Sequence, residues 1–460
     1  MKALKIILAL GMVILLGACA PKQTESSPTD DFQKDNALEE KFMEAAIEIS
    51  AVQVEAEDDE TSNAPQMVDA IEVEEAPRMQ DALGTEDDVE SIKITGKSIQ
   101  MDVSALCPQE GLWGVGGNKV YYGHYEGIPV AYRILAPSEV QTVENERPAL
   151  LLDCDYILLT REYDADGKKN DTQEKRQNQW KGSDLEDWLN GSDFLENTDV
   201  FSTLEKETIV SVTLAENATG YFAGKWTYDD FESTDRVFLL SAQEANHLYI
   251  ENSARIKAGT QVNWWLRSAF AEAGNGVGVI HSDGHICNNS VNNYSVGVSP
   301  AFNLALDHIL FASISGFDKS LELSEEASKV TDTTSNRWKV TLLDPDKTVE
   351  IAENGTIEKN QEDTKTMITV PYNCTGNGIT QISIMITDKP YIEQEAMVLY
   401  YGALTGIPNA EGTGSGTFIL PTKLQAQTCG KDYYAYLIAE EINGSYETDY
   451  ASEPYEILIL

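Results

Sequence analysis

Residues 277–289 read VGVIHSDGHICNN, and this stretch decides how the middle of the chain folds. Two short apolar runs flank Ser282-Asp283-Gly284, a turn sequence that typically joins two antiparallel strands. We therefore expect a β-hairpin here. The next strongest signal precedes it, in the segment WWLRS at residues 264–268. Its bulky apolar side chains predict that Trp265 and Leu266 lie in the core and that Arg267 is paired inside the protein.

Outward from this hairpin, the sequence predicts short strands mixed with a few short helices. Residues 120–135 alternate about Glu126-Gly127 and predict another hairpin. Three serines have the sequence context of helix N-caps: Ser183, Ser202 and Ser241. Glu186 and Glu205 each lie three residues after a capping serine, as in a capping box. Because the strands and helices do not alternate regularly, we expect an α+β fold for residues 96–312.

From residue 313 to residue 460 the sequence predicts strands only. Turn-rich segments separate the candidate strands, which are 338–343, 367–371, 379–387, 396–401, 417–420, 433–440 and 455–460. Ile382, Ile384 and Ile386 occupy every second position, which indicates a strand with one buried and one solvated face. About seven short strands in a segment of about 145 residues are typical of an immunoglobulin-like β-sandwich, and we expect that fold here.

Residues 100–310 resemble a domain of unknown function found in bacterial surface and secreted proteins. The resemblance rests on residues 123–135, the helix with Trp188, Val237–Ser241, the WLRS of residues 265–268 and the GVSPAF of residues 297–302. It implies the C-type-lectin-like fold, which formylglycine-generating enzymes and variable receptor-binding proteins share. The family usually carries arginine where this chain has Ser299, which puts any role of that arginine in doubt. A shared fold does not by itself give a function.

The first 19 residues resemble a bacterial lipoprotein signal. Two lysines precede the apolar run 6–16, which is too short to span a bilayer as a helix. Leu16-Gly-Ala-Cys19 resembles the lipobox, which implies removal of residues 1–18 and a lipid on Cys19. A plain secretory signal with a chance cysteine is the alternative. We expect a protein anchored to a cell membrane through this lipid, with its folded part on the extracellular face.

Residues 19–95 are strongly acidic, with roughly 22 acidic residues against 5 basic ones. Such a stretch buries too little apolar surface to fold, so we expect a disordered tether. A partner-binding segment is the alternative. The formal net charge of the whole chain is −43, which argues against binding nucleic acid and against binding anionic lipid directly. We therefore expect contact with the membrane through the lipid alone.

Five cysteines remain after the one that the lipid would modify, and an odd number leaves at least one of them unpaired. Among the possible pairs we expect a bridge between Cys374 and Cys429. Formylglycine-generating enzymes use a copper-binding cysteine pair, but Cys154 and Cys287 lie in different segments and match no such motif. The sequence also lacks a nucleophile elbow, a zinc-protease motif and a phosphate-binding loop.

His281, His285 and Cys287 are residue types that bind zinc, and the hairpin brings them near one another. Polar residues are ordinary at turns, however, so we expect neither a metal nor another cofactor.

The hairpin and the loop after it are the candidate ligand-binding surface. Amide and carboxylate groups bind vicinal hydroxyls, and a tyrosine ring stacks on a sugar. The residues concerned are Asp283, His285, Asn289, Asn292, Asn293 and Tyr294. Simple turn chemistry is the alternative explanation for the asparagines. We expect a cell-surface protein that binds a glycan, a wall polymer or a protein. The alternatives are a structural or adhesive surface module and an enzyme of the formylglycine-generating type.

Overall fold

The computed structural model describes residues 96–460 except 109–111, 142–145, 166–177, 216–225, 228–231, 259, 271–273, 317–318, 320–327, 334, 394 and 405–411. All of the described residues lie in one compact unit, Asp58–Leu460. The expected signal peptide and acidic tether, residues 1–95, lie outside the described residues. Among those described, 46% are in strands and 10% in helices. The expected α+β C-type-lectin-like domain followed by an immunoglobulin-like sandwich is therefore wrong, because the protein is mostly β and built on large mixed sheets.

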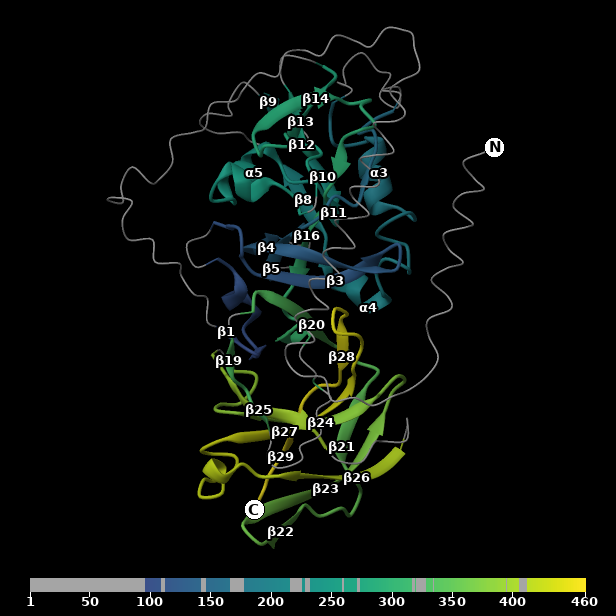
Figure 1. The fold of residues 1–460 in the computed structure, drawn as a ribbon. Coiled ribbons are helices and arrows are strands. Elements are labelled where there is room, and N and C mark those ends of the chain that lie inside the picture. Colours follow the sequence, from purple (N-terminus) through teal and green to yellow (C-terminus); the bar gives the residue numbers. More distant parts are fainter. Residues whose placement is uncertain are drawn as a thin grey trace, which may run out of the picture. The chain divides into compact units, whose positions relative to one another are not determined.

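One 15-stranded sheet runs through most of the described chain (Figure 1). The first part of the chain supplies one side of this sheet, in the spatial order β11 (Val237–Phe238), β16 (Ala301–Ala305), β5 (Glu146–Cys154), β4 (Ile128–Gln141) and β3 (Lys119–Tyr125). The last part continues it with β20 (Arg337–Leu343), β28 (Asp449–Ala451), β27 (Tyr434–Glu441), β24 (Gln381–Thr387), β25 (Val398–Ala403) and β18 (Ser328–Lys329). The two regions that the sequence predicted as separate folds thus share one sheet.

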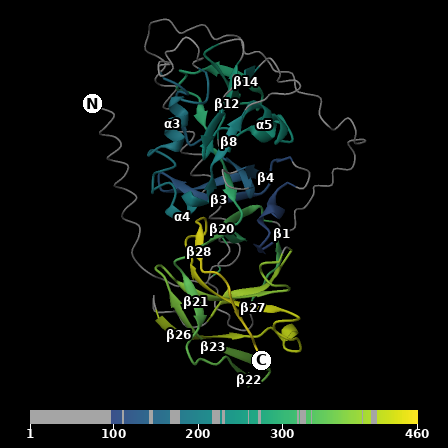
Figure 2. The ribbon, with the colours of Figure 1, turned by 180° about the vertical axis from the view of Figure 1, so that it is seen from behind.

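The join between the two sides of the sheet is a parallel pairing of β3 with β20. Lys119 is opposite Arg337, and Tyr121 is opposite Lys339. The two strands lie side by side in both views (Figures 1 and 2). β17 (Ile309–Ile314) pairs with the same β20 in the antiparallel direction. The expected domain boundary between residues 312 and 313 falls inside β17.

The local elements that the sequence predicted in the first part are present. β3 and β4 form the expected hairpin, with Gly127 in the left-handed region at φ 78°. Helices begin after each of the three capping serines, as α3 (Asp184–Asn190), α4 (Thr203–Thr208) and α5 (Ala242–His247). Both hydrogen bonds of the capping box form at Ser202 and at Ser241. At α3, the side chain of Glu186 instead accepts from the backbone N–H of Gly182.

A second, six-stranded sheet contains the hairpin with which the sequence analysis began. Its strands are β14 (Ile286–Ser290), β13 (Gly276–Ile280), β12 (Trp264–Phe270), β15 (Gly297–Val298), β6 (Leu159–Thr160) and β9 (Trp226–Thr227). Trp265 and Leu266 on β12 are both 0% exposed, and Arg267 pairs with Glu244 at 2.6 Å. These three predictions are confirmed.

Three strands that the last part contributes to the large sheet, β20, β24 and β27, are buried on both faces, and this is the physical reason that the sandwich prediction failed. Every residue of β24 is buried. Ile382, Ile384 and Ile386 pack into one apolar cluster, whereas Met385, on the other face of the strand, packs with Phe311 into another. The first cluster also receives side chains from a four-stranded sheet formed by β21 (Thr348–Ile351), β23 (Lys365–Thr375), β22 (Glu358–Glu362) and β26 (Gly412–Ile419).

Short elements complete the described chain: β1 (Gly96–Lys97), β2 (Ile99–Gln100), η3 (Val103–Leu106), β7 (Ile209–Val210), β8 (Val212–Ala215), β10 (Glu232–Asp235), η5 (Asn252–Arg255), β19 (Asp332–Thr333), η6 (Thr422–Leu424) and β29 (Tyr455–Ile457). None of the helices in the described ranges has the length and apolar character that a membrane-spanning helix needs.

Candidate functional site

The turn of the β13–β14 hairpin holds a small exposed cluster around Asp283. Asp283 Oδ1 lies 3.0 Å from His281 Nδ1 and 3.2 Å from His285 Nδ1, and all three side chains are about half exposed. Partial burial acts to raise the pKa of Asp283, but hydrogen bonds from the backbone N–H of His285 and from both imidazoles lower this pKa to about 2. The carboxylate therefore stays charged over the whole physiological pH range.

The loop after β14 places the asparagines and Tyr294 together. Asn289 Oδ1 accepts from Asn293 Nδ2 at 3.1 Å, and Asn292 Oδ1 accepts from the Ser290 hydroxyl at 2.8 Å. Asn293 Oδ1 accepts from the backbone and side chain of Ser295. The amide oxygens thus hold the shape of the turn, while the ring of Tyr294 is 67% exposed.

The six expected binding residues form two groups rather than one. Asp283 and His285 lie at the turn before β14, whereas Asn289, Asn292, Asn293 and Tyr294 lie at the far end of that strand. A strand rises about 3.3 Å per residue, so His285 and Asn289 are about 13 Å apart along the chain. The structure therefore brings the last four together and separates them from the first two.

The five cysteines that the structure describes are buried thiols. Burial raises the pKa of Cys154 and of Cys287 to about 12 in each case, so both remain protonated at neutral pH. Cys374 and Cys429 are free, and each donates to a different backbone carbonyl, so the expected bridge between them is wrong. Across the described ranges no group of three or more His, Cys, Asp and Glu side chains is arranged to hold a metal ion.

An open cavity of about 580 Å³ lies against β1, β18, β25 and η6, and the sequence did not indicate it. Lysines from three distant segments line it: Lys97, Lys329 and Lys423. Tyr400 and Leu424 add apolar surface, and none of the described residues that line the cavity is acidic. In a chain with a net charge of −43, such a local concentration of positive charge attracts an anionic ligand. Only the spatial convergence of these lysines reveals the cavity, because they are far apart in the sequence.

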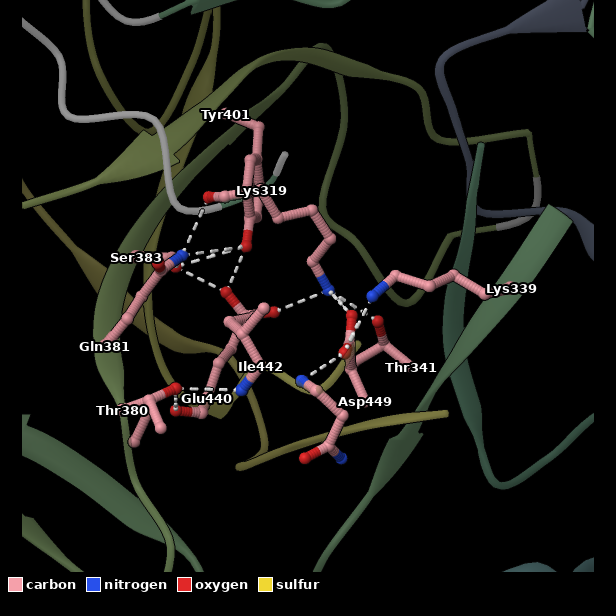
Figure 3. Close-up of polar contacts among 12 residues, drawn as sticks. Lys319, Lys339, Thr341, Thr380, Gln381, Ser383, Tyr401, Glu440, Ile442 and Asp449 are labelled. Carbon is pink, nitrogen blue, oxygen red and sulfur yellow. Dashed lines mark hydrogen bonds and ion pairs between the residues drawn. The ribbon is translucent and has the colours of Figure 1, made fainter. Parts of the chain in front are cut away.

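A cluster of buried charges lies inside the last part of the large sheet (Figure 3). The side chains of Lys319, Glu440 and Asp449 are 0% exposed, and that of Lys339 is 1% exposed. Lys319 lies between β17 and β18, while the others belong to β27, β28 and β20. Taking a charge out of water costs several kcal/mol per ion unless close partners offset it, so this cluster requires close pairing.

The distances within this cluster show that pairing. Lys319 Nζ is 2.8 Å from Asp449 Oδ2 and 3.0 Å from Glu440 Oε1. Asp449 Oδ1 accepts from Lys339 Nζ at 2.9 Å and from the backbone N–H of Asn443 at 2.8 Å. Two ammonium groups and two carboxylates therefore form a compact group with no net charge.

Asp153, on β5, is the centre of another buried cluster. Its Oδ2 accepts from the hydroxyl of Tyr249 and from the ammonium of Lys257, and its Oδ1 accepts from the hydroxyl of Ser299 at 3.1 Å. Burial lowers the pKa of Lys257 to about 8 although Asp153 acts to raise it. The family that the sequence resembles usually carries arginine where this chain has Ser299. In this chain Ser299 offers a hydroxyl to Asp153, and the positive charge that contacts Asp153 comes from Lys257.

One part of the chain matches a known family of proteins. Residues 154–306 match the family model of a domain of unknown function, DUF6273. The match begins at the last residue of β5 and ends one residue after β16. It confirms the expected presence of a domain of unknown function in this region. No curated protein matches the chain. No solved structure matches it either.

Proposed function

We propose that this protein is an exported lipoprotein that binds an extracellular ligand while a lipid on Cys19 holds it at the cell membrane. The proposed location rests on the sequence of residues 1–19, in which a short basic segment, an apolar run and small residues precede the cysteine. Lipid chains contribute about 0.8 kcal/mol per buried methylene, so two or more chains anchor a protein stably.

Among the ligand classes considered, a glycan, a wall polymer and a protein, the cavity with three lysines favours an anionic wall polymer. A concave space of about 580 Å³ is of the size that binds a small ligand or one segment of a polymer. Lys329 and Lys423 are exposed at its rim, whereas Tyr400 and Leu424 are buried and provide an apolar wall. Phosphate or carboxylate groups on a polymer would be held by the ammonium groups, and the sugar rings would pack on the apolar wall.

A binding array tests this function. The full-length protein in detergent micelles is applied to anionic wall polymers, neutral glycans and candidate proteins at low and high salt. We expect binding to the anionic polymers that weakens as salt increases, because salt screens exposed charges. The double variant Lys329→Ala/Lys423→Ala should lose this binding. The control Lys359→Ala/Lys365→Ala removes the same charge from exposed positions on β22 and β23 and should bind as the parent does.

Two results would contradict the proposal. Equal binding by the two double variants would exclude the cavity, and loss of binding in Tyr294→Ala would then assign the site to the loop after β14. Failure of the parent protein to bind any arrayed ligand would favour the second candidate function, a structural or adhesive surface module. The specific support for that alternative is the continuous sheet that joins the two parts of the described chain.

A further inference from the structure

We propose that Lys319 and Asp449 become joined by an intramolecular amide bond, with Glu440 carrying the proton and water leaving. The proposal rests on the positions of five groups, which together supply a nucleophile, an electrophile, a base and a pair of donors to the reacting carbonyl (Figure 3). It is independent of the proposed binding function, since it concerns the interior of the protein and needs no ligand.

The amine and the carboxyl group are held together by the fold. Lys319 Nζ is 2.8 Å from Asp449 Oδ2, and both side chains are fully buried. The backbone carbonyl of Lys319 accepts a hydrogen bond from Gln381 Nε2 at 3.0 Å, which ties the lysine to β24. Two reacting groups held in contact react as an intramolecular pair, which corresponds to effective concentrations of about 10⁵–10⁸ M in well-oriented cases.

Glu440 lies where it can act as the base in this reaction. Its Oε1 is 3.0 Å from Lys319 Nζ, yet this oxygen accepts no hydrogen bond of good geometry from the described residues. Its other oxygen accepts from the hydroxyls of Ser383 and Tyr401, which fixes the orientation of the carboxylate. Glu440 therefore presents a free lone pair to the amine that must lose protons.

Two donors face the oxygen that would become negative. Asp449 Oδ1 accepts from Lys339 Nζ at 2.9 Å and from the Asn443 N–H at 2.8 Å. Donors that are already in place at a developing oxyanion stabilise the transition state without reorganisation. These contacts also distinguish the two lysines, because Lys319 lies against the base whereas Lys339 lies against the oxyanion position.

The step is a condensation that balances without an oxidant or another reactant. One proton first moves from Lys319 Nζ to Asp449 Oδ2, which converts the ion pair into a neutral amine and a carboxylic acid. The nitrogen then attacks the Asp449 carboxyl carbon, and Glu440 takes a second proton from it. Glu440 returns this proton to Oδ2 as the carbon–Oδ2 bond breaks, which releases one water molecule and leaves one N–H in the new amide.

Burial of the reacting groups affects both the first step of this reaction and the stability of its product. Burial acts to lower the pKa of Lys319, but Asp449 and then Glu440 raise it above its ordinary value, so the ion pair is the resting form. In a dry interior the neutral pair costs less relative to the ion pair than it does in water, which makes the reactive form accessible. Exclusion of water afterwards protects the amide from hydrolysis.

The product satisfies the polar groups that remain. The amide oxygen keeps Lys339 and the Asn443 N–H as donors, and the amide N–H faces Glu440 Oε1. Lys339 and Glu440 remain as one positive and one negative charge. The buried pair of Lys257 and Asp153 provides an internal comparison, because Asp153 is the only carboxylate that contacts Lys257 among the described residues. We expect that pair to stay ionic.

Peptide mapping by tandem mass spectrometry tests the proposal on the full-length protein. After denaturation and digestion, the parent protein should yield a branched peptide that contains Lys319 and Asp449 and lacks the mass of one water molecule. Proteases that cut after lysine should pass over Lys319. Lys319→Arg should yield no branched peptide, because a guanidinium is not a nucleophile. Glu440→Gln keeps the shape of the side chain and should slow formation of the bond by about a hundredfold or more.

Several results would overturn the proposal. An unbranched map from the parent protein would refute it even if every variant failed to fold. A branch at Lys339 or at Lys257 would show that proximity to Glu440 does not select the nucleophile. Equal extents of linkage in Glu440→Gln and in the parent, with both proteins folded by circular dichroism, would remove Glu440 from the reaction.

Discussion

Thr448 Oγ1 donates a buried hydrogen bond of 2.5 Å to Glu205 Oε1, although 243 positions separate the two residues in the sequence. Glu205 is also the capping-box residue of α4, and its carboxylate accepts from the backbone N–H groups of Gly123 and Ser202. One side chain thus connects the start of α4, the bend in β3 and the residue before β28. This side-chain contact joins the two sides of the large sheet separately from the backbone pairing of β3 with β20.

We expect Thr448→Val to lower the free energy of unfolding by about 1–3 kcal/mol, because a buried carboxylate loses one of its donors while the shape of the side chain is kept. Urea denaturation measures the effect. Thr413→Val, at an exposed position on β26, is the control. In a double-variant cycle with Glu205→Gln, the two changes should not be additive. Additive effects would mean that the two side chains act separately.

Trp265→Ala should lower the free energy of unfolding by about 3–5 kcal/mol, because the ring is fully buried and its removal leaves a cavity. The indole N–H also donates to the Arg161 carbonyl at 2.8 Å. The contrasting variant is Tyr294→Ala, which removes a ring that is 67% exposed and should change stability by about 0.5 kcal/mol or less. Thermal melting of both variants measures this contrast, and similar losses in the two would contradict the burial argument.

We expect acid to lower the free energy of unfolding in part by protonating Asp155. Burial acts to raise the pKa of this carboxyl, but Arg133 at 2.6 Å and Lys119 at 2.7 Å lower it from 3.8 to about 2. A carboxyl group whose pKa is lower in the folded protein than in the unfolded chain stabilises the fold at pH values above the unfolded pKa. This contribution is lost as the pH falls through the folded pKa. The loss should therefore occur between about pH 4 and pH 2 and amount to roughly 2 kcal/mol. Asp155→Asn should flatten the stability curve in that window, and an unchanged slope would contradict the assignment.

If the amide between Lys319 and Asp449 forms, it closes a loop whose ends are 130 positions apart. Cross-linking a loop of about 100 residues reduces the entropy of the unfolded chain by an amount worth about 4–5 kcal/mol. The linked protein should therefore melt at a higher temperature than Glu440→Gln and migrate faster in a denaturing gel. Glu440→Gln alone retains a similar volume, so equal melting temperatures would show that no link contributes to stability.

Cys19→Ala should abolish incorporation of a labelled fatty acid and release the protein from the membrane fraction. The lipid on this cysteine is the expected anchor, and the net charge of −43 opposes attraction to anionic lipid. Fractionation of cells that express the parent or the variant measures the release. Equal membrane retention of the two would show that a different part of the chain holds the protein there.

The sequence predicted local structure better than it predicted how the strands combine. The hairpin around Gly127 and the helices after Ser202 and Ser241 depend on neighbouring residues, and all three are present. The pairing of β3 with β20 depends on partners more than 200 positions apart, such as Lys119 and Arg337, and nothing local in either strand specifies it. The expectation of two separate folds failed at this pairing.

The buried charges were missed for a related reason. Lys339 and Thr341 alternate with the apolar residues Trp338, Val340 and Leu342, a pattern that normally indicates one solvated face. In the structure both faces of β20 are covered, so the polar residues of the pattern face the interior and find partners there. Alternation identified the strand correctly, but it does not report whether the second face meets water.

The shared sheet also determines how fragments of this protein behave in solution. A chain cut near residue 312 would separate β3 from β20 and expose a row of unpaired backbone N–H and C=O groups on each fragment. Uncovered strand edges recruit other strands, including those of identical molecules. Fragments ending at the DUF6273 match would therefore tend to self-associate and precipitate, and recombinant production or crystallisation of that region is best attempted with β20 and its neighbouring strands retained.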